Sequence, residues 1–245
     1  MARSAFAAGA AFAAAATVGP TGPTVILVHG RSSNKSEYMR YAVPLHDRFN
    51  VVLVDLRDAG QSQAADETLG VRESSDVEAF VDWLVRTKSP AWIGVVGTSQ
   101  GAAAALGAAA TDPRIRAVVL DSTHSRIAGT IGRGIEQDRH LPAFPAQALS
   151  FFGAWLRTRV DVSAADPVDV IPTIGSRPLL LVHGGLDTYD PPADSVRLNY
   201  QAAVRAGVPV EIHVCPSADH DAVIDACPTE WRDWVTTFLV RVSGS

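Results

Sequence analysis

Lysine is scarce in this chain of 245 residues, where only Lys35 and Lys88 are lysines. The 21 basic residues are outnumbered by 26 acidic ones, which gives a net charge of -5 and leaves no basic stripe to follow a phosphate backbone. Nucleic acid is therefore not an expected partner. No stretch reaches the roughly 20 strongly apolar residues of a membrane-spanning helix, so we expect no transmembrane segment.

Cysteine is also rare. Cys215 and Cys227 are too few for a disulfide scaffold, and they lack the CxxC or histidine spacing of a zinc site. Because cysteine packs in cores as a small hydrophobe, we expect two free, buried thiols. The alternative is a single bridge around His220, which lies between them. We expect no metal and no organic cofactor.

The first 20 residues are rich in alanine and carry one arginine near the start. This pattern superficially fits a secretory signal. Alanine is only weakly hydrophobic, however, so we expect a packed helix or hairpin. The expected location is cytoplasmic, with secretion as the alternative if the segment is a signal. The sequence does not indicate the oligomeric state.

Short β-rich runs alternate with helical patterns along the rest of the chain. Because the runs are apolar on both faces, we expect one α/β domain (1–245) with a largely parallel sheet between helices. The expected strands are 24–28, 50–56, 91–96, 116–121, 178–182 and 209–214. The expected helices are 75–86, with Ser75 as its cap, 100–110, 192–205 and 228–242.

The segment 122–174 interrupts this alternation, because about fifty residues separate two expected strands where half that length would do. Its apolar residues recur at helical spacing, so we expect an inserted helical cap. We expect the cap aromatics mainly to pack the cap itself, with a wall for the substrate as the alternative. These aromatics are Phe144, Phe151, Phe152 and Trp155.

The pentapeptide GTSQG at 97–101 places Ser99 between an expected strand and an expected helix. The flanking glycines leave room for a sharp turn that holds the central residue in an unfavourable conformation and lifts its hydroxyl clear of the sheet. The positive end of a helix favours negative charge that develops nearby. Ser99 is therefore a candidate nucleophile rather than a serine that only satisfies a turn.

A serine hydroxyl needs a base within hydrogen-bond reach and a third group that orients the base. In open parallel sheets, binding sites lie beyond the carboxyl ends of the strands. One strand ends at His183 and leads to Asp187, and the next leads to His220. The order along the chain is therefore serine, aspartate, histidine.

These features resemble the α/β-hydrolase superfamily, in its serine-hydrolase branch of esterases, lipases and related peptidases. The resemblance runs from Thr24 to the C-terminus. It rests on VILVHG (25–30), VDLRDAGQS (54–62), GTSQG (97–101), HGGLD (183–187) and ADH (218–220). It implies an α/β-hydrolase fold with Ser99 as nucleophile, Asp187 as acid and His220 as general base.

The resemblance also implies an oxyanion hole, in which two backbone N–H groups stabilise the charge on the carbonyl oxygen. One N–H belongs to Gln100, which follows the nucleophile. The other belongs to Arg31, with Ser32 as the alternative if the loop is shifted.

Other polar residues near strand ends are weaker candidates. Asp190 is the alternative acid if its loop has another register, and Asp121 is a further one. His183 and His29 belong to His-Gly turns, so we expect structural hydrogen bonds from both. His124 enters the cap and is a candidate contact for the substrate.

The chain departs from the family pattern at two places. Asp58 stands where many relatives have glycine, and only about twenty residues precede the strand at 24–28, where the fold normally opens with two further strands. We expect either a reduced sheet edge built from the Ala-rich start or the absence of these two strands.

The expected function is hydrolysis of a small-molecule carboxylic ester through an acyl-enzyme intermediate. The alanines and aromatics of the cap favour an apolar acyl or aryl group in the substrate. The alternatives are a peptidase or amidase with the same triad, or a binding protein that keeps the fold without the chemistry.

Overall fold

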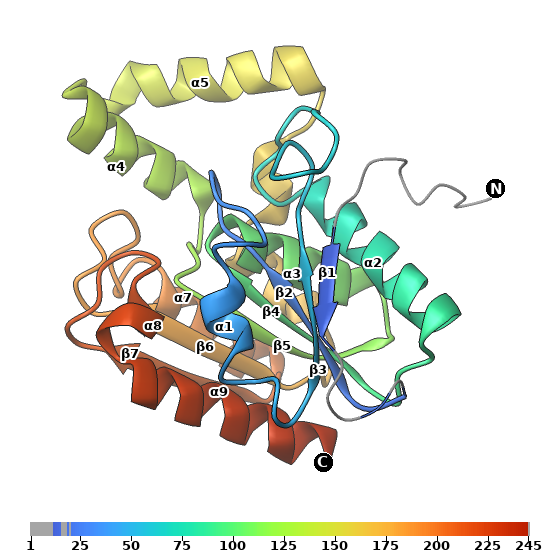
Figure 1. Ribbon diagram of the computed structural model, residues 1–245. Coiled ribbons are helices and arrows are strands. Elements are labelled where there is room, and N and C mark those ends of the chain that lie inside the picture. Colours follow the sequence, from blue (N-terminus) through green and yellow to red (C-terminus); the bar gives the residue numbers. More distant parts are fainter. Residues whose placement is uncertain (1–11, 16–18, 20, 245) are drawn as a thin grey trace.

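A computed structural model of the protein describes residues 12–15, 19 and 21–244. They form a seven-stranded sheet with the strand order β1-β3-β2-β4-β5-β6-β7 (Figure 1). The strands are β1 (Phe12–Ala15), β2 (Thr24–Val28), β3 (Asn50–Val54), β4 (Ile93–Thr98), β5 (Ile115–Asp121), β6 (Leu179–Gly184) and β7 (Val210–Cys215). Every neighbouring pair from β3 to β7 is parallel, which confirms the expected sheet.

The edge beside β3 is closed by β1, which runs antiparallel and places Phe12 opposite Val54 and Ala15 opposite Val51. Of the two alternatives for this edge, the structure therefore has the reduced edge built from the Ala-rich start. Most of the segment for which we expected a helix or hairpin lies outside the described residues.

Helices lie between successive strands from β2 onward and follow β7. They are α1 (Met39–Ala42), α2 (Glu73–Thr87), α3 (Gln100–Thr111), α4 (Ile127–Arg139), α5 (Ala143–Thr158), η1 (Val162–Ala165), α6 (Pro167–Val170), η2 (Ile171–Thr173), α7 (Val196–Ala206), α8 (Val223–Ala226) and α9 (Pro228–Ser243). Ser75 does not cap α2, because the helix begins two residues earlier and Arg72 occupies the N-cap position. Helix α7 begins four residues later than expected, after a turn in which the N–H of Asp194 donates to the carbonyl of Pro191.

Two apolar layers hold the sheet between helices. On one face, buried side chains of α2, α3 and α7 pack against the strands, among them Phe80 and Leu106. On the other face, α1 and α9 contribute Tyr41, Trp231 and Phe238. The strands are apolar on both faces because both are covered.

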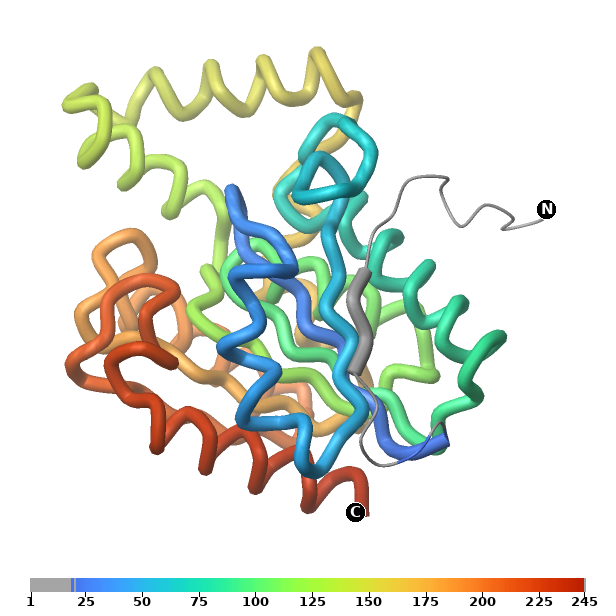
Figure 2. Tube along the Cα trace, viewed as in Figure 1, coloured from blue at the N-terminus to red at the C-terminus, as the bar shows by residue number. Residues whose placement is uncertain are grey.

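The segment 122–174 contains α4, α5, η1, α6 and η2, so the expected helical insertion is present. It follows β5 at the carboxyl end of the strand. Helices α4 and α5 project from the layered body, and Figure 2 follows the chain out along α4 and back along α5. Among the described residues, no helix combines the length and the apolar character needed to cross a bilayer.

Candidate active site

Ser99 occupies a strained turn between β4 and α3, with φ 51° and ψ -120°. Left-handed φ values are costly for a residue with a side chain. The turn also requires two flanking glycines. A Cβ on Gly97 would lie 2.3 Å from the carbonyl oxygen of Gly101, and a Cβ on Gly101 would lie 2.3 Å from that of His29. The sequence GTSQG therefore contains the small residues that this turn needs.

Three predicted side chains meet at this turn. The Ser99 Oγ lies 3.0 Å from Nε2 of His220, and Nδ1 of the same ring lies 2.8 Å from Oδ2 of Asp187. The Asp187 carboxylate is fully buried, and its other oxygen accepts a 2.7 Å hydrogen bond from the N–H of Asp190. The arrangement allows a proton to pass from the hydroxyl to the imidazole while the carboxylate holds the ring.

Carboxylates dominate the electrostatics around His220. Burial on its own lowers the pKa of this histidine, but the hydrogen bond to Asp187 and the charges of Asp221, Asp187 and Asp190 outweigh burial and raise the pKa to about 9. The ring is therefore held in the charged form over a wide pH range.

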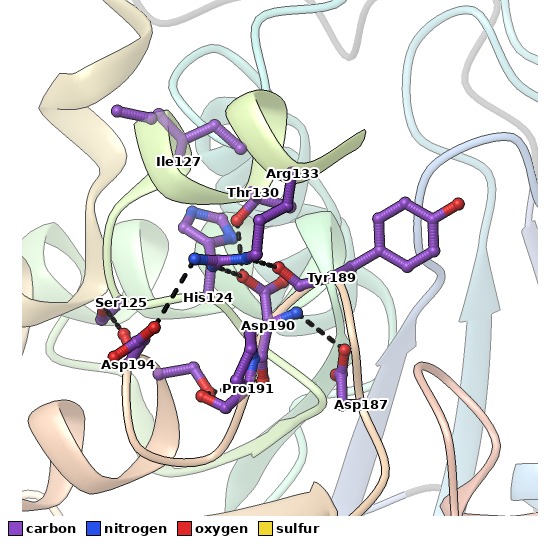
Figure 3. A network of polar contacts seen from close by, with 12 residues as sticks. His124, Ser125, Ile127, Thr130, Arg133, Asp187, Tyr189, Asp190, Pro191 and Asp194 are labelled. Carbon is purple, nitrogen blue, oxygen red and sulfur yellow. Dashed lines mark hydrogen bonds and ion pairs between the residues drawn. The ribbon is translucent and has the colours of Figure 1, made fainter. Parts of the chain in front are cut away.

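Asp190, the alternative acid, also faces His220, but at 4.0 Å from Nδ1. Its side chain instead joins the cap. Thr130 on α4 donates a 2.5 Å hydrogen bond to Oδ1 of Asp190, and Arg133 on the same helix lies 3.4 Å from that oxygen (Figure 3). Burial raises the pKa of Asp190.

Arg133 is the centre of this network between the cap and the loop after β6. Its Nε donates to the carbonyl of Tyr189, and its guanidinium also lies 3.7 Å from Asp194 (Figure 3). Further along α4, Gln137 donates to the carbonyl of Thr188 at 3.1 Å. The cap therefore holds the loop on which Asp187 is placed, a role that our sequence analysis missed because Arg133 has no recognisable motif.

Asp121, the third candidate acid, points elsewhere. It accepts hydrogen bonds from Nε1 of Trp231 at 2.8 Å and from the hydroxyl of Ser122 at 2.9 Å, and burial raises its pKa to about 7. The two histidines of the His-Gly turns bond to backbone: His183 to the carbonyl of Asp190, and His29 to the carbonyl of Gly30.

His124 is buried at the entry to the cap. Burial, with a smaller contribution from the charge of His220, lowers its pKa to about 4, so the ring is neutral near pH 7. Its Nε2 has no hydrogen-bond partner among the residues that the structure describes. Contact between His124 and the substrate stays a prediction.

Asp221 is a second residue that the sequence analysis missed, although it directly follows His220. It adopts a left-handed φ of 55°, which turns its carboxylate back toward the turn of Ser99. Oδ1 lies 3.7 Å from Nε2 of His220, and a Cβ on Gly30 would lie 3.1 Å from Oδ2. A third of the side chain is exposed, but burial of the group raises its pKa to about 6.

The predicted oxyanion donors border one cavity. Gln100 begins α3, where the first N–H groups of a helix have no partner within the helix. Gln100 and Arg31 both line a cavity of about 360 Å³, together with residues 29–34, 56–60 and Glu67.

The cavity is lined mainly by polar side chains. Arg31 forms a 3.0 Å ion pair with Glu67 at the wall of the cavity. Asp58, which stands where many relatives are expected to have glycine, adopts a left-handed φ of 60° there.

The expected packing of the cap aromatics is wrong for three of them. Phe144, Phe152 and Trp155 are exposed.

The two cysteines form a disulfide, so the expectation of free thiols is wrong. Cys215 ends β7 and Cys227 precedes α9, and the bridge joins them with an S–S distance of 1.98 Å. The bridge closes the loop that carries His220. Within the part of the chain that the structure describes, no three His, Cys, Asp or Glu residues are placed to hold a metal ion.

Comparisons with known proteins agree with this architecture. A model of the alpha/beta hydrolase fold matches residues 23–145. An uncharacterized protein of Mycobacterium tuberculosis is 29% identical over 212 residues, which are 84% of this chain and 65% of the relative, so the chain spans about two thirds of the length of that relative.

Solved structures of esterases are also similar. The esterase Pf2001 of Pyrococcus furiosus is 27% identical, with a TM-score of 0.74 over 89% of this chain and 83% of the esterase. An esterase from Thermogutta terrifontis is 22% identical, with a TM-score of 0.66. The match covers 96% of this chain and 94% of the esterase, and the two share the fold. These similarities support a hydrolase.

Proposed function

Since the chain belongs to the alpha/beta hydrolase fold family, we propose that it is a serine hydrolase that cleaves carboxylic esters through an acyl-enzyme intermediate. The observation that carries the proposal is the line of hydrogen-bond distances from Ser99 to His220 and from His220 to Asp187. The similarity to esterases supports the choice of an ester bond.

In the first half of the reaction, Nε2 of His220 takes the proton of Ser99, and Oγ attacks the carbonyl carbon of the ester. The backbone N–H groups of Gln100 and Arg31 stabilise the oxyanion of the tetrahedral intermediate. His220 then gives its proton to the departing alcohol, which leaves an acyl group on Ser99. Asp187 fixes the imidazole tautomer and stabilises the charged ring.

In the second half, a water molecule takes the place of the alcohol. His220 accepts one proton of the water, the resulting hydroxide attacks the acyl carbon, and collapse of the second intermediate returns the proton to Ser99 and releases the acid. The sum is one ester and one water converted to one acid and one alcohol. The scheme uses only groups of this chain and water.

Substitution of the nucleophile tests the proposal. We expect Ser99→Ala to lower kcat for a short p-nitrophenyl ester by about 10⁶-fold, as in other serine hydrolases that lose this group. Ser150→Ala, at an exposed serine of α5, is the matched control and should keep full activity. A fluorophosphonate should label the wild-type protein and not Ser99→Ala.

Three outcomes would contradict the proposal. If Ser99→Ala retains turnover, another group is the nucleophile, and if the wild type shows neither turnover nor labelling of Ser99, the fold serves binding rather than catalysis. If peptide anilides are cleaved with a higher kcat/KM than esters of the same acyl group, the protein is an amidase with this triad, because an amine leaving group demands stronger protonation.

A further inference from the structure

The cap carries an apolar surface that neither the core nor the proposed reaction uses. Six of its large apolar side chains are exposed, a concentration that is unusual for a protein surface. These residues, here named the apolar cap surface, are Leu141, Phe144, Leu149, Phe152, Trp155 and Leu156. The side chain of Phe144 is 79% exposed and that of Leu149 is 66% exposed.

The contacts of α5 show that this surface faces away from the rest of the molecule. Leu149, Phe152 and Leu156 share one side of the helix by their spacing. A different side carries Gln147, which donates to the carbonyl of Ala128 in α4. A third side carries Arg157, which pairs with Asp66 of the body. Gln147 and Arg157 therefore make the contacts of α5 with α4 and with the body, and the apolar side chains do not.

One arginine lies near each end of α5, where Glu136 and Asp161 also lie. Arg139 lies in the last turn of α4, and Arg159 is the C-cap residue of α5. Neither side chain has an ion-pair partner among the described residues, whereas Arg126, Arg133 and Arg157 of the cap are all paired. The guanidinium of Arg159 lies over the Trp155 ring, 4.9 Å from its centroid.

We propose that the apolar cap surface binds the anionic face of a lipid bilayer. A helix that presents Trp, Phe and Leu on one side and arginines at its ends fits the boundary between headgroups and acyl chains. There the apolar side chains enter the acyl region, and Arg139 and Arg159 meet lipid phosphates. The stacked Trp155 and Arg159 place an apolar ring and a charge side by side, as this boundary requires.

The same charges argue against a second copy of the chain as the occupant. A two-fold axis through the middle of α5 would pair the helices antiparallel and bring Arg159 of one copy close to Arg139 of the other. Like charges that face each other across an interface cost binding energy. An anionic lipid surface pairs both arginines instead.

Vesicle flotation tests this proposal independently of the proposed catalysis when the full chain carries Ser99→Ala. We expect flotation with phosphatidylcholine vesicles that contain phosphatidylglycerol, and about tenfold weaker binding to phosphatidylcholine alone.

Substitutions in the apolar cap surface test which residues bind. The double variant Phe152→Ser with Trp155→Ser should lower binding to the anionic vesicles by at least about tenfold. Arg139→Gln with Arg159→Gln should abolish the preference for anionic vesicles. The control is Leu198→Ser, at an exposed leucine of α7, which should bind like the parent.

Three results would overturn the proposal once circular dichroism shows that the variants are folded. Absence of flotation with both kinds of vesicle is the first. Equal binding to anionic and neutral vesicles is the second, because the arginines would then have no role. The third is a protein that binds no vesicles and forms a concentration-dependent dimer in sedimentation velocity. If Phe152→Asp converts that dimer to a monomer, the surface binds a second copy of the chain.

Discussion

The Asp221 carboxylate lies 3.7 Å from Nε2 of His220, the same ring nitrogen that lies 3.0 Å from the Ser99 hydroxyl. Asp187 holds the opposite nitrogen of the ring, so His220 has a carboxylate on each side. A base must be neutral to accept a proton. Both carboxylates favour the charged ring. Asp187 and Asp221 together therefore raise the pH at which His220 becomes a neutral base.

Removal of the Asp221 charge should shift the pH profile. With the His220 pKa near 9, kcat/KM of the wild type rises through this pH as the ring loses its proton. Above pH 6 Asp221 is ionised, and a unit charge at this separation contributes about 1 kcal/mol even in water, or about one pKa unit. Asp221→Asn should therefore move the acid limb of kcat/KM about one pH unit lower and raise activity at pH 7 about tenfold.

Asp225→Asn serves as the control for this shift, because Asp225 is exposed on α8, four residues after Asp221, and pairs with Arg40 rather than His220. Its pH profile should match the wild type. An acid limb that stays in place in Asp221→Asn would show that Asp221 does not act on the base.

The two carboxylates of the loop after β6 should differ sharply in importance. Asp187→Asn should lower kcat by about 10⁴-fold, the effect measured when the acid of a serine protease triad is replaced in this way, since the amide favours the wrong imidazole tautomer. Asp190→Asn should cost about tenfold or less, because Asp190 lies 4.0 Å from Nδ1 and bonds to the cap. Steady-state kinetics on one p-nitrophenyl ester measure both, and equal losses would mean that the acid is shared.

Arg133 should act as a positioning residue through the loop that it holds. Arg133→Met removes the cation between Tyr189, Asp190 and Asp194, so we expect kcat to fall about tenfold with KM little changed, as a small misplacement of the acid would produce. Arg133→Lys should restore part of kcat.

Arg126→Met is the matched variant for that experiment. Arg126 precedes α4 and pairs with Asp169 at 2.7 Å rather than with a residue of the loop of Asp187, so its loss should leave kcat unchanged. If Arg133→Met and Arg126→Met lower kcat equally, Arg133 has no specific effect on the position of Asp187, and the ion pairs of the cap contribute only to the stability of the fold.

The disulfide should stabilise both the fold and the loop of His220. It closes a loop with a sequence separation of 12, for which the restriction of the unfolded chain corresponds to about 3 kcal/mol. Cys227→Ser should therefore lower the free energy of unfolding in urea by about this amount. Dithiothreitol should have the same effect on the wild type and none on Cys227→Ser, whereas identical unfolding curves with and without reductant would contradict the prediction.

The positions of the three central residues could be predicted because each depends on local order. Ser99, Asp187 and His220 follow strands whose apolar runs are visible in the sequence, and the carboxyl ends of parallel strands share one edge of the sheet. Gly97 likewise reflects a local requirement for space, since a Cβ there would meet the carbonyl of Gly101.

Other features depend on how distant segments pack, which no local pattern encodes. Asp221 lies against Gly30 in the distant loop after β2, and Arg133 reaches Asp190 only because α4 lies over the loop after β6. The helical spacing of Leu149, Phe152 and Leu156 predicted a helix, but not that these side chains would face outward. The bridge between Cys215 and Cys227 required the approach of β7 to the start of α9.

The tight contact between Gly101 and the carbonyl of His29 ties two loops into one unit. Gly101 belongs to the helix that starts with Gln100, and His29 directly precedes Gly30 and Arg31, so the two proposed amide donors share a common frame. A backbone in contact with another backbone has no side chain that could rotate to relieve a shift. The relative position of the two proposed donors is therefore set by the backbone itself, before any substrate arrives.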